Sequence, residues 1–203
     1  MPFKKLHPAI KEKLESFEIA TPTPFQSKSI PLIKSGANLF CTAPENSGKT
    51  TTLLLTTMQK LKCEEEGMAP RAIILVGDHE KAESLYELFY EYTRRTSLRV
   101  YFCNEKLHID LLKSEIFEGT DILISTPQIM NKLLLLNGVN VTQLKLFCID
   151  DAEFLHQKTP LSNIMAITQS LVKCQFVIYS EKMHPYLKRF ESYFMTNART
   201  VSL

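Results

Sequence analysis

The residues best suited to binding an anion follow one another in a single loop. An apolar run over residues 38–42 leads into a polar loop that ends in Gly48-Lys49-Thr50, and residues 51–61 are typical of a helix. In a strand, loop and helix arranged in this way, backbone N–H groups converge on one point, where the helix dipole favours an anion. Lys49 would reach the β- and γ-phosphates of a nucleotide, and the Thr50 hydroxyl would ligate Mg²⁺.

The loop also departs from the usual phosphate-binding pattern. That pattern opens with a glycine where this chain has Ala43, and Gly48 is the only glycine of the loop. At Asn46 we expect a left-handed backbone, because Asn tolerates this conformation better than most residues do. The alternative interpretation is an ordinary turn before a helix, with Lys49 as a solvated charge.

A second group of polar residues follows another apolar run. Residues 144–149 predict a buried strand, and the strand leads into Asp150-Asp151-Ala152-Glu153. In an open α/β sheet, ligands bind outside the carboxyl ends of the strands, so these acids and the phosphate loop would share one edge. Asp150 fits the position that holds Mg²⁺ opposite the phosphate loop. The alternative is that these acids cap a helix, as acids that follow strands commonly do.

The composition narrows the class of protein. With 203 residues, of which 44% are apolar and 23% charged, the chain is expected to form one soluble globular domain. A net charge of +2 neither supports nor excludes a nucleic-acid partner. No apolar run approaches the roughly 18 residues that a membrane span needs, and residues 1–5 lack a signal-peptide core. We therefore expect no membrane partner and a cytoplasmic location.

The cysteines and histidines predict neither disulfides nor a metal site. The five cysteines are scattered without a Cys-x-x-Cys pair, and the five histidines lack His-Glu-x-x-His spacing. We expect the cysteines to be reduced and mostly buried.

Seven short apolar runs interleaved with helical segments predict an α/β fold. Such alternation is typical of a mostly parallel seven-stranded sheet with helices on both faces. The predicted strands are residues 38–42, 71–76, 98–103, 121–125, 144–149, 175–179 and 199–203. The predicted helices are residues 8–17, 24–34, 49–61, 79–94, 107–117, 127–136, 160–171 and 185–194.

The segment before the first strand has its own signals. Thr23 is expected to cap the helix that follows it, with Gln26 three residues later in the spacing of a capping box. We expect a single domain, residues 1–203. Within it, an N-terminal helical region over residues 1–36 precedes a sheet core over residues 37–203.

The order of these motifs resembles the first RecA-like lobe of the DEAD-box RNA helicases, and the likeness covers nearly all of the chain. Residues 43–50 resemble the family's Ala-x-Thr-Gly-Ser-Gly-Lys-Thr, and residues 150–153 stand where Asp-Glu-Ala-Asp is expected. Residues 125–127 stand where the RNA-contacting Thr-Pro-Gly-Arg motif begins, and residues 179–182 stand where Ser-Ala-Thr is expected. The fold that this resemblance implies is a RecA-like P-loop NTPase domain.

The resemblance also implies a site for Mg²⁺–ATP or ADP. Phe17 and residues 22–26 resemble the adenine-reading Q motif, in which Gln26 would hydrogen-bond the adenine edge and Phe17 would stack on it. The capping box is the alternative, because it explains Gln26 without any ligand. The residues expected to contact the nucleotide are Phe17, Gln26, Pro44, Glu45, Asn46, Ser47, Gly48, Lys49, Thr50 and Thr51.

Further roles follow from the same resemblance. Thr50 and Asp150 would hold Mg²⁺, partly through water, and Lys49 and Asp151 would act in hydrolysis. The residues expected to contact RNA are Thr126 and Pro127. The residues expected to connect the motifs to one another are Glu153, Ser180 and Lys182.

Several positions depart from the family pattern. Asp151 replaces the glutamate that orients the attacking water, so its carboxylate falls about one methylene short, which can cost ~10²-fold in rate. Glu153 and Lys182 replace an Asp and a Thr that normally bond to each other, and we expect a salt bridge between them instead. The arginines of two RNA-facing motifs are missing at residues 77–81 and 126–129, which predicts weak contacts with RNA phosphates.

We therefore expect a domain that binds Mg²⁺–ATP or ADP, hydrolyses ATP slowly or not at all, and binds RNA weakly. The second lobe of the resembled family supplies an arginine finger worth roughly 10³–10⁵ in rate. That lobe is not in the sequence, so we do not expect unwinding by this chain alone. Two alternatives remain open. One is a non-enzymatic interaction or scaffold module, and the other is half of an ATPase completed in trans by a second RecA-like lobe or another protein.

Overall fold

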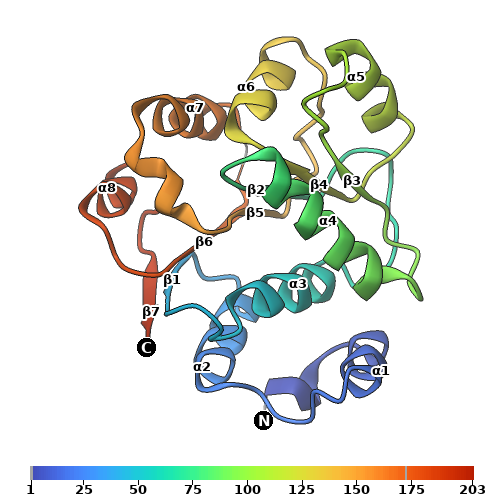
Figure 1. Ribbon diagram of the computed structural model, residues 1–203, viewed down its shortest axis with the longest axis vertical. Helices are drawn as coiled ribbons and strands as arrows, with labels where there is room; N and C mark the ends of the chain where they lie inside the picture. The colour runs from blue at the N-terminus through green and yellow to red at the C-terminus, as the bar shows by residue number, and fades with distance from the viewer. Residues whose placement is uncertain (1, 172) are drawn as a thin grey trace.

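The centre of the molecule is a seven-stranded sheet. The computed structural model describes residues 2–171 and 173–203, and its strands are ordered β3-β4-β2-β5-β6-β1-β7 with every pair parallel (Figure 1). The strands are β1 Leu39–Thr42, β2 Ala72–Leu75, β3 Val100–Phe102, β4 Ile122–Ser125, β5 Leu146–Ile149, β6 Gln175–Ser180 and β7 Arg199–Ser202. This arrangement confirms the predicted α/β class, and all seven predicted strands are present.

Helices cover both faces of the sheet. The α-helices are α1 Pro8–Ser16, α2 Pro24–Lys34, α3 Lys49–Lys60, α4 His79–Thr93, α5 Ile109–Phe117, α6 Pro127–Leu135, α7 Lys158–Gln169 and α8 Pro185–Lys188. Three short 3₁₀ helices are η1 Pro2–Lys5, η2 Ala152–His156 and η3 Arg189–Ser192. None of the α-helices in the described part of the chain is long and apolar enough to cross a membrane.

Alternation along each strand divides the core into two layers. Successive strand side chains point to opposite faces, so Cys148 packs with α1–α4 while its neighbour Phe147 packs with α5–α8. Figure 1 shows these two groups of helices on opposite sides of the sheet. Both faces of the sheet are therefore apolar. For this reason the central strands are continuous apolar runs in the sequence, without alternation of apolar and polar residues.

Two helix predictions differ from the structure near the C-terminus. Helix α7 begins at Lys158 rather than at Pro160, because proline is tolerated throughout a first helical turn and not only at its first residue. The helix predicted over residues 185–194 is a single α turn, α8, followed by η3. The short helix η2 was not predicted at all.

The cysteines are unpaired, as expected. Four of them are buried, and Cys174 is half-buried. Burial raises the pKa of each thiol, to about 11 for Cys63 and about 12 for Cys103 and Cys174, and well above the ordinary value for Cys41 and Cys148. In the folded chain these thiols are neutral apolar groups of the core.

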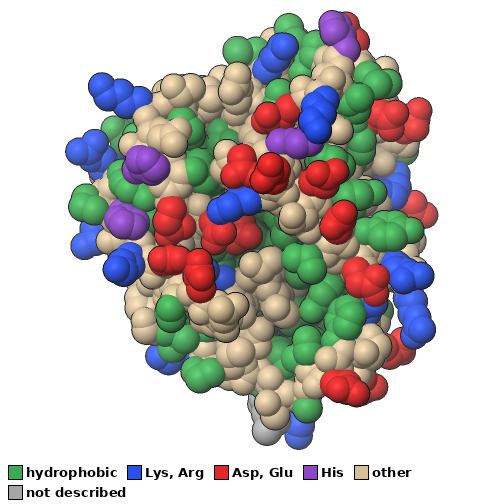
Figure 2. All heavy atoms as spheres, in the orientation of Figure 1, with side chains coloured by type: hydrophobic (Ala, Val, Ile, Leu, Met, Phe, Trp, Pro, Cys, Tyr) green, Lys and Arg blue, Asp and Glu red, His purple; other side chains and the backbone are tan. Residues whose placement is uncertain are grey.

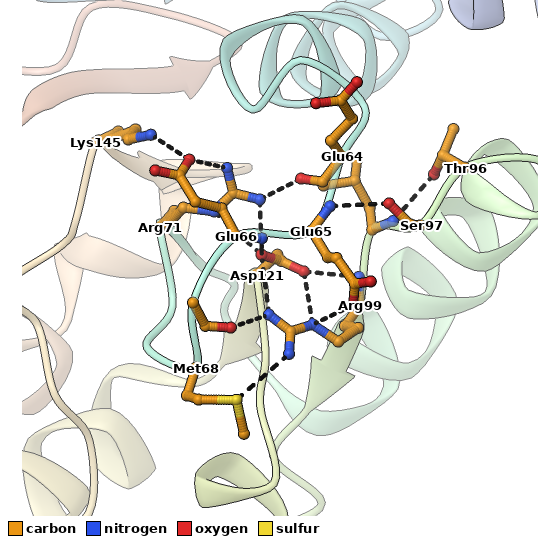
Figure 3. A network of polar contacts seen from close by, with 12 residues as sticks. Glu64, Glu65, Glu66, Met68, Arg71, Thr96, Ser97, Arg99, Asp121 and Lys145 are labelled. Atoms are coloured by element: carbon orange, nitrogen blue, oxygen red, sulfur yellow. Dashed lines mark hydrogen bonds and ion pairs between the residues drawn. The ribbon is translucent and has the colours of Figure 1, made fainter.

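An ion-pair network ties together the amino-terminal ends of four neighbouring strands (Figure 3). The fully buried carboxylate of Asp121, just before β4, accepts from Arg71 Nη2 at 2.6 Å and from Arg99 Nε at 2.9 Å. These arginines immediately precede β2 and β3. Glu66 extends the network, because its Oε2 lies 2.9 Å from Arg71 Nη1 and 2.8 Å from Lys145 Nζ, which precedes β5.

The network determines the ionisation of its central acid. Burial by itself would raise the pKa of Asp121, but hydrogen bonds from Arg99 and Arg71 outweigh it and hold the pKa below its ordinary value. The backbone N–H of Glu66 also donates to Oδ1 at 3.1 Å, so the carboxylate is well supplied with donors.

We predict that Asp121→Asn lowers the unfolding free energy by about 3–5 kcal/mol, because it removes the buried counter-charge of Arg71 and leaves it only the exposed Glu66. Urea unfolding measures this value. Since the folded-state pKa of Asp121 is depressed, its contribution is present above its ordinary pKa and is lost as pH falls through the lower folded value. The difference in unfolding free energy between wild type and Asp121→Asn should therefore become smaller below about pH 4.

Asp110→Asn is the matched control for this prediction. Asp110 is exposed and pairs with His108 and Lys113 on the surface. Its replacement should cost no more than about 1 kcal/mol. Equal losses in the two variants would contradict a special role for the buried carboxylate.

Candidate functional site

The loop between β1 and α3 has two left-handed residues. The φ angle of Asn46 is 59°, which confirms the prediction from its residue type, and that of Gly48 is 92°. A Cβ atom at Gly48 would lie 2.6 Å from Gln26 Nε2, so any other residue there would strain the backbone and displace the Gln26 side chain. The backbone reversal brings the loop onto the amino end of α3, where free N–H groups face outward.

Lys49 lies along this loop and is buried except for 7% of its surface. Its ammonium donates to the carbonyl oxygen of Ala43 at 2.6 Å and to that of Pro44 at 3.0 Å. Lys49 is therefore not the solvated charge of the alternative interpretation. Its Nζ atom is held at the mouth of the loop, with a third donor position to offer an anion.

Gln26 performs the capping role that was the alternative to base recognition. Its Oε1 accepts from the backbone N–H of Thr23 at 2.9 Å, while the Thr23 hydroxyl accepts from Gln26 N at 3.2 Å, which completes a capping box at α2. Thr23 also donates to the carbonyl of Ser47 at 2.7 Å. The capping box thus supports the phosphate loop, and contact between Gln26 and an adenine stays a prediction.

Phe17 lies apart from the other predicted nucleotide contacts. Its ring centroid is 5.0 Å from that of Tyr92, and the Lys13 ammonium lies 4.4 Å from the ring centre. Phe17 lines a separate cavity of about 450 Å³ between α1 and the end of α4. Stacking of Phe17 on a base is not tested by this arrangement and stays a prediction.

Two adjacent acids follow β5, as predicted. Asp150 is 7% exposed, and its Oδ1 has no hydrogen-bond partner among the described residues. Burial, and after it the neighbouring Asp151, raise its pKa to about 7, against the opposing effects of Lys81 and Lys49. Asp151 has a left-handed backbone, with φ of 48°, and its Oδ2 accepts from Lys81 Nζ at 3.1 Å.

The phosphate loop and these acids line adjoining cavities. The first cavity, of about 610 Å³, is lined by Glu45, Asn46, Gly48, Lys49, Thr50, Thr51, Lys81, Asp151, Glu153 and Glu181. Asp150 lines the second, of about 400 Å³, which shares Thr50, Lys81 and Asp151 with the first. Pro44 and Ser47 are not among the residues that line the first cavity. Figure 2 shows acidic side chains gathered across the middle of one face of the molecule.

The predicted salt bridge between Glu153 and Lys182 is not among the ion pairs of residues 2–171 and 173–203. Instead, Glu153 Oε1 accepts from the backbone N–H of Glu181 at 2.6 Å. Ser180 donates to the carbonyl of Lys182 at 3.0 Å. The motifs after β5 and β6 are thus joined, but through the backbone, because the turn after β6 brings an N–H group to the carboxylate first.

Thr126, one of the two predicted RNA contacts, already has a partner. It is buried at the start of α6 next to Pro127, and its hydroxyl donates to Glu105 Oε1 at 2.6 Å. A carboxylate therefore occupies the position in which this hydroxyl would meet a phosphate.

Sequence reasoning missed three charged residues at this edge of the sheet. Lys81 and Glu181 line the larger cavity, and Glu105 binds Thr126. Lys81 was visible as a charge within the altered motif of residues 77–81, where the resembled family has a leucine. No pattern in the sequence pointed to Glu105, because it lies in an irregular loop far along the chain from its partner.

Metal binding by side chains alone is not indicated. Within the described part of the chain, no group of three or more His, Cys, Asp or Glu side chains is arranged to hold a metal ion. The unpartnered oxygen of Asp150 and the nearby Thr50 hydroxyl suit Mg²⁺, which commonly takes one or two protein ligands and completes its shell with phosphate and water.

Comparison with known protein families identifies the family of this chain. The profile of the DEAD/DEAH box helicase family matches residues 23–182. The chain belongs to the DEAD/DEAH box helicase family. The matched segment runs from the capping box of α2 to the turn after β6, and so includes both the phosphate loop and the acids after β5.

Relatives of this DEAD/DEAH box domain are much longer proteins. The ATP-dependent RNA helicase ddx54 of Dictyostelium discoideum is 25% identical over 183 residues, which are 90% of this chain and 17% of that protein. The probable ATP-dependent RNA helicase DDX28 of Mus musculus is 29% identical over 145 residues, which are 68% of this chain and 27% of that protein.

Solved structures share the fold. A DEAD box protein from Methanococcus jannaschii superposes with a TM-score of 0.89 at 18% identity, over 98% of this chain and 54% of that one. Dbp5 of S. cerevisiae, in a complex with nup159, gle1, IP6 and ADP, gives a TM-score of 0.83 at 20% identity, over 98% and 52% of the two chains. The chain thus spans about half the length of these structures.

We predict that Gly48→Ala destabilises this DEAD/DEAH box domain more than Gly36→Ala does. Both glycines have left-handed φ angles, but a Cβ at Gly36 meets nothing within 4 Å, whereas at Gly48 it meets Gln26. Gly36→Ala should therefore cost only the backbone strain of about 1–2 kcal/mol, and Gly48→Ala should exceed it. Urea unfolding of the two variants measures the difference, and equal losses would show that the close approach to Gln26 is unimportant.

Proposed function

We propose that this domain binds Mg²⁺–ATP or ADP in the cavity between the phosphate loop and the acids after β5. The observation that carries the proposal is the position of Lys49. A nearly buried ammonium held by two loop carbonyls, at the amino end of a twelve-residue helix, faces the cavity that Asp151 lines from the other side. Positive charge and free N–H groups on one wall and acids on the other suit a phosphate chain that carries a divalent cation.

Each residue of the site has a separate task in this proposal. The loop N–H groups and Lys49 would hold the phosphates. Thr50 and Asp150 would hold Mg²⁺, which when bound neutralises phosphate charge and polarises the terminal phosphoryl group. The relatives named ATP-dependent RNA helicases, and the ADP in the Dbp5 complex, support the choice of an adenine nucleotide.

Slow or absent hydrolysis is part of the proposal. Asp151, the candidate for orienting the attacking water, has a short side chain, a left-handed backbone and an ion pair with Lys81. The short side chain leaves its carboxylate about one methylene from the place that a water-orienting group would need, and the ion pair engages that carboxylate with Lys81. The alternatives are a scaffold role and half of an ATPase completed in trans by another protein. Nucleotide binding is needed for the second, and its absence would favour the scaffold.

We predict that a fluorescent ADP analogue with Mg²⁺ binds the wild-type protein saturably, and that Lys49→Ala weakens its binding tenfold or more. A hydrogen bond to a charged partner contributes about 1.5–3 kcal/mol, which corresponds to roughly 10–150-fold in affinity. Fluorescence anisotropy measures both dissociation constants.

Lys28→Ala is the control for that titration. Lys28 lies on the exposed side of α2 and its ammonium is 3.5 Å from the carbonyl of Ser202, so the variant removes the same charge outside the cavity. Binding should be unchanged in Lys28→Ala. If the wild type does not bind nucleotide at all, the nucleotide-binding proposal fails and the scaffold alternative is favoured.

Weak RNA binding is also proposed, and Glu105 is the observation that supports it. The Thr126 hydroxyl and the amino end of α6 would suit a phosphate, but a carboxylate lies there already. An RNA phosphate would have to displace Glu105 and would be repelled by it. RNA binding near Thr126 is therefore weakened by the added negative charge of Glu105 as well as by the missing arginines.

We predict that Glu105→Ala strengthens binding of single-stranded RNA several-fold and makes it more sensitive to salt, because one phosphate contact is regained. The control is Glu118→Ala, which removes an exposed acid after α5, at the opposite edge of the sheet. Anisotropy of labelled oligouridine at several salt concentrations measures both effects. Equal gains in the two variants would mean that net charge alone, and not the Thr126 position, governs RNA affinity.

A further inference from the structure

Lys81 projects from the first turn of α4 into the space between the phosphate loop and the acids. Its ammonium is 3.1 Å from Asp151 Oδ2, which is supplied by a residue 70 positions along the chain. Lys81, Asp151 and Thr50 are the three residues that line both adjoining cavities. This ammonium therefore lies close to the predicted place of the Mg²⁺ ion.

The stability of α4 does not explain a lysine at this position. Lys81 is the third residue of the helix, after the N-cap Asp78, and its backbone N–H is capped by the Asp78 carboxylate at 2.9 Å. A cation in the first turn of a helix is unfavourable, because the helix dipole is positive there. The lysine thus weakens its own helix slightly while it reaches Asp151.

The ion pair itself also adds little to folding. The side chains of Lys81 and Asp151 are 50% and 45% exposed, and such pairs contribute roughly 0–1 kcal/mol. The effect of this ammonium must therefore be sought in the charge of the cavity rather than in the stability of the chain.

The charge that faces Lys81 is strongly negative. Asp78 and Glu80 flank it on its own helix, and Asp150 and Asp151 face it from the end of β5. Glu153 and Glu181 line the larger cavity beside it. Lys49, the other lysine of that cavity, also acts on Asp150 but donates to the loop carbonyls, whereas the ammonium of Lys81 forms an ion pair with Asp151.

We propose that Lys81 is a built-in counter-charge of the nucleotide site, which neutralises Asp151 and so reduces the dependence of nucleotide binding on Mg²⁺. The inference rests on the proposed nucleotide site. Without Mg²⁺, the phosphates of a nucleotide would meet unscreened carboxylates, and opposite charge a few ångströms away offsets that repulsion. Thr50 and Asp150 remain available to Mg²⁺, whereas Asp151 is already paired.

The test measures the affinity of a fluorescent ADP analogue with excess MgCl₂ and with EDTA, in wild type and in Lys81→Met. Methionine keeps the length of the side chain and removes the charge. For the wild type, the dissociation constant in EDTA should exceed that in Mg²⁺ by no more than about threefold, whereas for Lys81→Met this ratio should rise to about thirtyfold. Thermal unfolding of both proteins verifies that the variant is folded.

Two further variants make the test specific. Lys106→Met removes a charge from the exposed loop after β3, at the same edge of the sheet but outside both cavities, and should behave as wild type. Adding Asp151→Asn to Lys81→Met removes the acid that Lys81 compensates, and should return the ratio to within about threefold of wild type.

The outcomes separate this inference from the proposed function. Suppose that nucleotide binding depends on Lys49 but that wild type and Lys81→Met show the same Mg²⁺ dependence. This result would overturn the role of Lys81 and leave the proposed nucleotide site intact. A double variant as Mg²⁺-dependent as Lys81→Met would also overturn it, because Lys81 would then not act through Asp151. No nucleotide binding by the wild type would overturn both.

Discussion

The burial of one carboxylate is the constraint on which this structure depends. Asp121 has no exposed surface, so its carboxylate stays ionised only because donors surround it, and Arg71 and Arg99 can supply them only if β2, β3 and β4 begin side by side. Once these strand ends are aligned at one edge of the sheet, parallel pairing aligns the opposite ends as well. The polar residues after β2 and β5 are thereby brought together without any direct bond having to hold them there.

Most of the fold could be predicted because it depends on short-range patterns. Both faces of the sheet are covered, so each strand is an apolar run with turn residues at its ends, and seven such runs were recognisable. The phosphate loop was also recognisable from a short stretch of sequence, Gly48-Lys49-Thr50 between a strand and a helix, and the residue type of Asn46 indicated its left-handed backbone. The helix capped by Thr23 was likewise encoded within four residues.

The parts of the site that could not be predicted are long side chains whose partners lie far along the chain. Glu153 was expected to meet the ammonium of Lys182 but meets a backbone N–H instead, since the choice depends on the shape of one turn. Phe17 packs against Tyr92, from a helix that begins more than sixty residues later, and this contact was not predicted, while its contact with a nucleotide stays a prediction. Periodicity carries no information about such pairings, which follow from loop geometry and rotamers.

The reactivity of the buried cysteines would report on local and global opening of the sheet. Since each thiol is neutral and most are enclosed, alkylating reagents would modify them only when the surrounding strands separate. Cys148 lies on β5, the central strand of the sheet, and Cys41 on β1, between β6 and β7, whereas Cys174 is half-buried just before β6. Their labelling rates would therefore distinguish fraying at one strand end from loss of the whole sheet, without any added probe.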